Sequence, residues 1–403
     1  MSILFGLISC KKKKSETSSS PLDPYISFVQ KQETSAKDYV LQQFDTYDFV
    51  VLAERDHRDI TQYELIVKVI ADSIFKSKVK HIFLEIGTKR LQKRMNAFLS
   101  QEGLSDSEID KEIKYIQRNA WYFPVWEKHN YAYFFRELYK INQTLKPTEK
   151  IKVYPSGLTM NWNTTKTFSD MKNAHKYRAV KDSIMALNIM HDIDSLTVHE
   201  PGKKQKALLI LNYHHAFNDN FTSENACTNY LFKKYGDRIT NIFIHAKSFV
   251  VSHELEDSAN EGKEVPIQNG KWDAAFELEG NPNIGFDFAD SPFGNDYFDY
   301  YPYRASDYRY ADIFKGYVFY KPISEFKLVL GYDGLLEDGF KEEYGRRLEL
   351  FKQYRKNDST FKLGSVSNSL NSVKEYPIED LDTIQYLINR RIEEHLESRK
   401  TFN

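Results

Sequence analysis

Acidic and imidazole side chains follow several short apolar segments of this sequence, each at the point where a strand is expected to end. Glu54 and His57 follow the segment 49–53, and Glu85 follows the segment 81–84. In the same way, the segment 207–211 is followed by His214 and His215. Open α/β sheets hold their ligands at the carboxyl ends of parallel strands. These side chains are therefore expected to meet at one rim of a sheet.

Carboxylates beside imidazoles support two kinds of hydrolytic chemistry. A carboxylate bonded to an imidazole fixes its tautomer and raises its basicity, so that the other ring nitrogen can take a proton from water. The same groups can instead bind a divalent metal, with four ligands: Glu54, His57, Glu85 and His215. Structural explanations also stay open, because Glu54 and Arg55 can form a surface ion pair and Glu85 can cap the next helix.

The elements that would position these residues alternate between short apolar runs and longer stretches of helical period. This alternation predicts an α/β fold with a mostly parallel sheet flanked by helices. The expected strands are 49–53, 81–84, 151–154, 207–211, 241–244 and 317–320. The expected helices between them are 60–76, 89–99, 105–117, 126–142, 168–190 and 224–234.

Three regions are expected along the chain. Residues 1–20 are a signal and tether, residues 21–335 form the α/β domain, and residues 336–403 form a helical C-terminal segment that packs on the body. Within the domain, residues from about 249 to 320 form an insertion that is rich in Tyr, Phe and Asp. Its aromatic rings can either wall a ligand pocket or pack against one another.

The composition restricts the classes of protein to which the chain can belong. With 41% hydrophobic and 28% charged residues, the 403-residue chain is expected to fold. No nucleic-acid partner is expected, because 56 Lys and Arg against 57 Asp and Glu leave a formal charge of −1. G-x-G-x-x-G, P-loop, G-x-S-x-G and H-E-x-x-H motifs are absent, which disfavours the enzyme classes that use them.

The first twenty residues resemble the N-terminus of a bacterial lipoprotein. The apolar segment 2–9 ends at Cys10, and four lysines and a serine-rich run follow it. Residues 7–10, Leu-Ile-Ser-Cys, are similar to a lipobox, where the signal peptide is cut before the cysteine and the cysteine is acylated. This resemblance implies a membrane anchor on Cys10 and a place in the bacterial cell envelope. An ordinary frayed N-terminus, with a cytoplasmic protein, is the alternative.

Four motifs, in order, resemble those of the erythromycin esterase-like proteins. They are Ala53-Glu54-Arg55-Asp56-His57, Phe83-Leu84-Glu85, the helical run Lys-Asp-Ser-Ile-Met-Ala-Leu-Asn at 181–188, and Asn212-Tyr213-His214-His215-Ala216. The wider superfamily includes ChaN-type haem-binding proteins and TraB/Tiki metalloproteases. The resemblance covers about residues 49–245. Ala53 and Lys181 stand where the family usually has glycine and arginine.

The resemblance implies a hydrolase of an ester or lactone that uses no cofactor. Water would be activated by His57, while Glu54 and Glu85 orient the imidazoles or relay their protons. His215 would polarise the carbonyl or protonate the leaving group, and His214 is the other candidate for this role.

Other expectations also follow from this family resemblance. Asp182 and Asn188 are expected to support the site or pack their helix. A metal-dependent hydrolase of the TraB/Tiki type and a ChaN-like lipoprotein that binds haem stay open as alternatives. The expected partner is a small-molecule substrate, sizeable and partly apolar or sugar-like if the aromatic insertion lines the pocket.

Overall fold

A seven-stranded sheet forms the centre of the computed structural model, which describes residues 20–199, 202, 204–221, 225–249, 263–299, 307–356 and 369–400. The strand order is β3-β2-β4-β1-β5-β9-β8. Neighbouring strands are parallel except for the antiparallel pair β8 and β9. The bounds are β1 Phe49–Glu54, β2 His81–Thr88, β3 Lys152–Gly157, β4 Ala207–Asn212, β5 Ile239–Ile244, β8 Ile284–Asp287 and β9 Gly316–Phe319. The prediction of an α/β fold with a mostly parallel sheet is confirmed.

The central strands are apolar along their length because both faces of the sheet are covered. In β1, Phe49, Val51 and Ala53 face one core, whereas Val50 and Leu52 face the other. Successive side chains of a strand point to opposite faces, so a strand buried on both sides needs apolar residues at every position.

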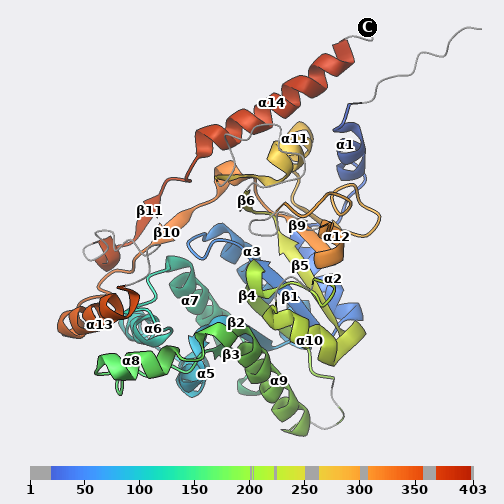
Figure 1. The fold of residues 1–403 in the computed structure, drawn as a ribbon. Coiled ribbons are helices and arrows are strands. Elements are labelled where there is room, and N and C mark those ends of the chain that lie inside the picture. The colour runs from blue at the N-terminus through green and yellow to red at the C-terminus, as the bar shows by residue number, and fades with distance from the viewer. Residues whose placement is uncertain are drawn as a thin grey trace, which may run out of the picture.

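Helices form a layer on each face of the sheet (Figure 1). One layer contains α2 Ala36–Thr46, α3 Thr61–Ala71, α4 Ser73–Lys78, α5 Gln92–Ser100, α6 Asp106–Asn119 and α7 His129–Gln143. The other contains α1 Asp23–Val29, α9 Lys181–His199, α10 Cys227–Tyr235, α11 Lys271–Leu278, α12 Tyr310–Ile313 and α14 Leu381–Lys400. Across the described part of the chain, none of the helices has the length and apolarity needed to span a membrane.

Two of the expected helices are interrupted, and two near the N-terminus were not expected. The helix predicted over 60–76 stops at Ala71, because Asp72 caps α4 by accepting a hydrogen bond from the Ile74 N–H. The helix predicted over 168–190 is divided into α8 Phe168–His175 and α9. The prediction began its elements at 49 and so missed α1 and α2.

The described part of the aromatic insertion packs into the core. Phe288, Phe293 and Tyr317 contact Trp272 of α11, and Phe286 packs on Tyr317; these four residues are at most 3% exposed. None of the described residues between 284 and 320 lines the principal pocket. Of the two expectations for this insertion, its described part therefore follows the second, in which the rings pack against one another.

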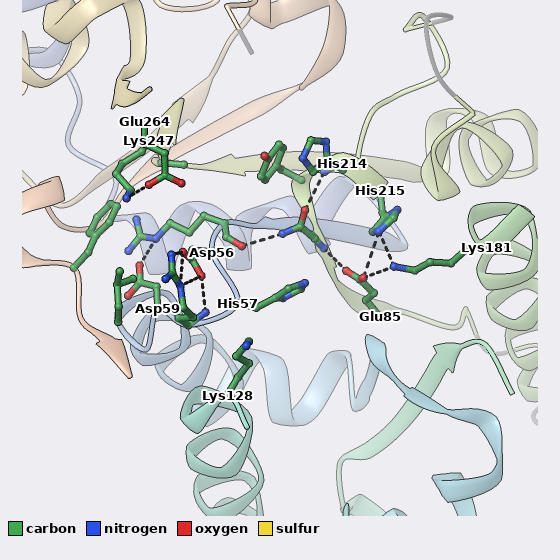
Figure 2. A pocket seen from close by; sticks show the side chains of 17 residues that line it. Asp56, His57, Asp59, Glu85, Lys128, Lys181, His214, His215, Lys247 and Glu264 are labelled. Atoms are coloured by element: carbon green, nitrogen blue, oxygen red, sulfur yellow. Dashed lines mark hydrogen bonds and ion pairs between the residues drawn. The ribbon is translucent and has the colours of Figure 1, made fainter. Parts of the chain in front are cut away.

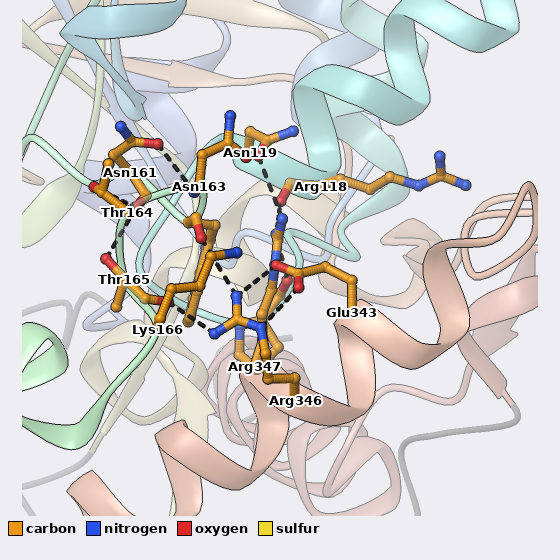
Figure 3. A network of polar contacts seen from close by, with 12 residues as sticks. Arg118, Asn119, Asn161, Asn163, Thr164, Thr165, Lys166, Glu343, Arg346 and Arg347 are labelled. Carbon is orange, nitrogen blue, oxygen red and sulfur yellow. Dashed lines mark hydrogen bonds and ion pairs between the residues drawn. The ribbon is translucent and has the colours of Figure 1, made fainter.

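The C-terminal segment is held to the body by an arginine network on α13 Phe340–Arg355 (Figure 3). Arg347 donates to the carbonyl oxygens of Arg118 and Pro124 at the end of α6 and beyond. Arg346 donates to the Thr165 carbonyl at 2.8 Å, in the segment that follows β3. Both guanidinium groups also bond Glu343 of the same helix.

Candidate functional site

A cavity of about 460 Å³ opens at the carboxyl ends of β1, β2 and β4 (Figure 2). The loop after β1 and the turn after β4 supply most of its wall. Other lining residues come from α7, α9, β6 Lys247–Phe249, β7 Glu264–Pro266 and β10 Leu328–Leu330, or precede them directly. The lining side chains are Arg55, Asp56, His57, Arg58, Asp59, Glu85, Lys128, Lys181, Asn212, Tyr213, His214, His215, Ala246, Lys247, Glu264, Phe326 and Leu328.

The first carboxylate and imidazole pair is Glu54 with His57. Glu54 Oε2 lies 3.2 Å from His57 Nδ1, at ion-pair distance but without ordinary hydrogen-bond geometry. Burial alone would lower the pKa of His57, but the Glu54 carboxylate outweighs it and raises that pKa above its usual 6.5. The ring of His57 points toward Glu85 in Figure 2, and it makes a T-shaped contact with Trp126, with ring centroids 5.2 Å apart. His57 Nε2 is thus the nitrogen left for a water or substrate.

The second pair is Asp182 with His215. Asp182 Oδ1 lies 2.6 Å from His215 Nδ1, and His215 Nε2 lies 3.3 Å from Glu85 Oε1. Burial would lower the pKa of His215 and the nearby Lys181 ammonium also opposes protonation. The carboxylates of Glu85 and Asp182 prevail and raise the pKa to about 9. The two carboxylates therefore favour the imidazolium form of His215 near neutral pH, against the Lys181 ammonium, whose Nζ lies 3.0 Å from His215 Nε2.

Glu85 lies between the two pairs, 3.3 Å from His215 Nε2 and with one carboxylate oxygen within 4.8 Å of ligand atoms of Glu54 and His57. Its Oε1 accepts from Lys181 Nζ at 2.7 Å, and its Oε2 accepts from the Asn212 N–H at 2.9 Å. Burial alone would raise the pKa of this carboxyl, but the charges of Lys181 and His215 have the larger effect and hold the pKa well below its usual range. Lys181 Nζ also lies 4.9 Å from the centre of the Trp121 ring, in a cation–π contact. Glu85 is accordingly a fixed anion between charged donors.

His214 and His215 have different surroundings, although they are adjacent in the sequence. The His214 ring packs at a tilt against the Tyr213 ring, with centroids 4.0 Å apart, and it contacts no carboxylate within hydrogen-bond distance among the described residues. Burial and the charge of His215 lower the pKa of His214 to about 4. His214 is therefore neutral near pH 7, and His215 is the imidazole that faces the carboxylates.

The structure brings all five candidates together: Glu54, His57, Glu85, His214 and His215. The surface ion pair considered for Glu54 and Arg55 is wrong, because both residues are buried and Arg55 Nε bonds Asp59 Oδ2 at 2.6 Å. Glu85 likewise bonds Lys181 and the turn after β4 rather than the following helix.

Several residues of the pocket were not among the sequence candidates. Lys181 and Asp182 contact Glu85 and His215 directly, although only a supporting role was expected for Asp182. The sequence did mark both residues, since they begin the run 181–188, one of the four motifs that resemble the erythromycin esterase-like proteins. Lys128, Lys247 and Glu264 enter from distant segments, and no local pattern in the sequence marks them. Asn188 donates to the Ser156 carbonyl, in agreement with a packing role.

The donor set fits a divalent metal only in part. Glu54, His57 and Glu85 each offer one ligand atom, and these three atoms lie within 4.8 Å of one another. However, the Lys181 ammonium bonds Glu85 and the charged His215 lies beside it. Two positive charges at this place repel a further cation. His215, the fourth ligand expected from the sequence, is outside the three-residue group.

The comparisons with known proteins give distant similarities in structure alone. No protein-family model matches this chain, and no curated protein does. The type III effector HopBA1 shares 13% identity, with a TM-score of 0.33 over 58% of this chain and 94% of that one. A Bacillus cereus protein shares 10% identity, with a TM-score of 0.41 over 74% and 96% of the two chains. ChaN of Campylobacter jejuni, described with cofacial haem binding, shares 15% identity, with a TM-score of 0.32 over 59% of this chain and 93% of that one. At TM-scores below 0.5, these similarities carry no argument about function.

Proposed function

We propose that this pocket hydrolyses an ester or lactone with a water molecule activated by His57, as in an erythromycin esterase-like enzyme. The observation that carries the proposal is the pairing of two imidazoles with separate carboxylates, Glu54 with His57 and Asp182 with His215. Titratable groups whose environments separate their pKa values are suited to opposite roles in acid and base catalysis. Residues from all four motifs of the resemblance meet in this pocket, which supports the same proposal.

In the proposed reaction, neutral His57 takes a proton from water as the water oxygen attacks the carbonyl carbon. Glu54 stabilises the imidazolium that forms. The Lys181 ammonium and the charged His215 stabilise the negative charge that develops on the carbonyl oxygen. When the carbon–oxygen bond of the ester breaks, His215 gives its proton to the leaving alkoxide. Proton exchange with solvent then restores both imidazoles.

The direct test compares the full chain with its His57→Ala variant on a panel of esters and lactones, macrolides included. Loss of a general base lowers the rate by about 10²- to 10⁴-fold, so we expect kcat/KM to fall within that range. His191→Ala is the matched control, because this imidazole is 76% exposed on α9, outside the pocket. Full activity in His57→Ala would contradict the proposal.

A metal-dependent hydrolase is the second candidate, favoured by the close donor atoms of Glu54, His57 and Glu85. Such a metal would polarise the carbonyl or supply the attacking water when bound. Activity that disappears with a chelator and returns with added Zn²⁺ or Mn²⁺ would favour this candidate. In the same preparation, a Soret band on adding haem would favour the haem-binding alternative.

The lipid anchor on Cys10 belongs to this proposal as well, and it would place the enzyme in the bacterial cell envelope. Residues 1–19 lie outside the described residues. Expression of the full chain in bacteria, followed by mass spectrometry, tests the anchor. A diacylglyceryl group on Cys10, lost in Cys10→Ser, is the expected result.

A further inference from the structure

Fourteen of the seventeen residues that line the pocket carry polar or charged side-chain groups, in contrast to the usual ligand site. Small-molecule sites are lined mainly by apolar and aromatic side chains, with a few polar groups that set orientation. Here the plainly apolar lining residues are three of seventeen: Ala246, Phe326 and Leu328. Charged side chains lie on both sides of His57, with Glu85 and Lys181 on one side and Asp56 and Glu264 on the other (Figure 2).

These charges balance one another. Five Lys and Arg side chains and four carboxylate side chains line the cavity, and the fifth of these cations, Lys128, bonds Glu127 just outside it. The charged His215, which also lines the cavity, bonds Asp182 outside it. The other four cations each contact one lining carboxylate, in the pairs Arg55–Asp59, Arg58–Asp56, Lys181–Glu85 and Lys247–Glu264. A pocket of paired charges has little net field to select an anion or a cation.

We infer that the substrate is a carbohydrate ester or lactone, a neutral molecule with several hydroxyl groups; this inference rests on the proposed function. A hydroxyl group both donates and accepts hydrogen bonds, so it can bond an ammonium and a carboxylate in turn. An alkyl surface in the same place would strip water from these charged groups without replacing its hydrogen bonds. The pocket therefore selects sugar derivatives over apolar lactones such as macrolides.

The test uses two acetate esters that differ in their hydroxyl groups: a methyl 6-O-acetyl-hexoside and cyclohexylmethyl acetate. Sites built to bond a substrate hydroxyl discriminate against the analogue without it by up to about 10⁴- to 10⁵-fold. The sugar ester is tested for each of the common hexoses. For the best of them, we expect kcat/KM to be at least about 100-fold higher than for cyclohexylmethyl acetate. Lys247→Met should reduce this preference. The exposed Lys93 on α5, outside this pocket, provides the matched control Lys93→Met.

Binding provides a readout that does not need turnover. Trp126 contacts His57, and Trp121 contacts Lys181, so occupancy of the pocket should change tryptophan fluorescence. Unacetylated methyl hexosides should give a saturable change that Lys247→Met weakens, whereas cyclohexylmethanol should give none.

The outcomes separate the inference from the function on which it rests. Equal or faster hydrolysis of cyclohexylmethyl acetate, with loss in His57→Ala, would overturn the carbohydrate class and leave the hydrolase standing. Saturable binding of a methyl hexoside without hydrolysis of any ester would support the ligand class and count against the reaction. If no hexose derivative is bound or hydrolysed, the inference is overturned.

Discussion

The pocket and the α13 arginine network are both clusters of buried and partly buried charge, but their charged groups face different partners. In the network, Arg346 and Arg347 donate to backbone carbonyls and share Glu343. Burial alone would raise the pKa of Glu343, but hydrogen bonds from the two arginines lower it to about 2. These groups keep one charge state across the physiological range, so the network is suited to holding segments together.

The pocket instead contains imidazoles, and burial and neighbouring charges move the pKa values of two of them in opposite directions. The pKa of His214 is lowered to about 4, and that of the adjacent His215 is raised to about 9. Perturbed groups of this kind in a cavity are typical of functional sites. The two regions differ in what their charges indicate. Arginines that bond backbone carbonyls indicate a structural role, whereas neighbouring imidazoles with widely different pKa values beside a cavity indicate a catalytic role.

The largest effect on activity, apart from that of His57, is expected from Glu85→Gln. The change leaves Lys181 and His215 without their shared carboxylate, and it should lower kcat/KM by about 100-fold or more. Steady-state kinetics on the best ester of the panel, with circular dichroism to establish folding, makes the measurement. Glu349→Gln on the surface of α13 is the control. A folded Glu85→Gln protein with unchanged kcat/KM would contradict the catalytic role that the comparison gives to the charged groups of the pocket.

A substitution in the α13 arginine network should lower the stability of the protein rather than its activity. Arg347 has a side chain that is 4% exposed, and Arg347→Met leaves Glu343 and two backbone carbonyls without its hydrogen bonds. Removing one partner of a buried ion pair costs about 3–5 kcal/mol, and the partial exposure of Glu343 favours the lower end. Urea denaturation should show the lower free energy of unfolding, while kcat/KM per folded molecule stays the same. A large loss of kcat/KM in the folded variant would show that the two regions are coupled.

The pH dependence of activity sharpens the assignment of roles. The rate should rise as His57 loses its proton, at a pKa above 6.5, and fall as His215 loses its proton near pH 9. The optimum is therefore expected on the alkaline side of neutral. In Asp182→Asn, loss of the carboxylate should move the alkaline limb from about 9 toward 6.5, the usual pKa of histidine. Asp194→Asn, on the exposed side of α9, should leave the limb in place; an unmoved limb in Asp182→Asn would count against His215 as the acid.

The smallest effect is expected at the exposed pair of Lys352 and Glu349, 2.8 Å apart on α13. Exposed ion pairs contribute about 0–1 kcal/mol, so Lys352→Met should lower the free energy of unfolding by less than about 0.5 kcal/mol. The same denaturation series makes the comparison with Arg347→Met. A loss as large as that of Arg347→Met would show that burial does not distinguish the network from the surface.

The sequence allowed six of the seven strands of the sheet to be predicted because they contain continuous apolar runs, a local property. The short strand β8, Ile284–Asp287, was missed. The gathering of Glu54, His57 and Glu85 follows from that sheet. Glu54 ends β1 and His57 follows it, and Glu85 lies within β2 just after Leu84, the last β2 residue that pairs with β4. The choice between His214 and His215 depends on the distance to Asp182, which only the fold sets. Contributions from Lys128 and from segments beyond residue 245 depend on long-range packing, for which the chain carries no periodic signal.

The central claim is that neighbouring groups shift the pKa values of the three pocket imidazoles, His57, His214 and His215. An NMR titration of the histidine side chains tests this claim without knowledge of the substrate. Long-range ¹H–¹⁵N correlation spectra of the full chain, assigned with His57→Gln, His214→Gln and His215→Gln, would follow each ring from pH 4 to pH 10. The account predicts a midpoint near 9 for His215, a midpoint near 4 for His214, and one above 6.5 for His57. Midpoints near 6.5 for all three rings would contradict it.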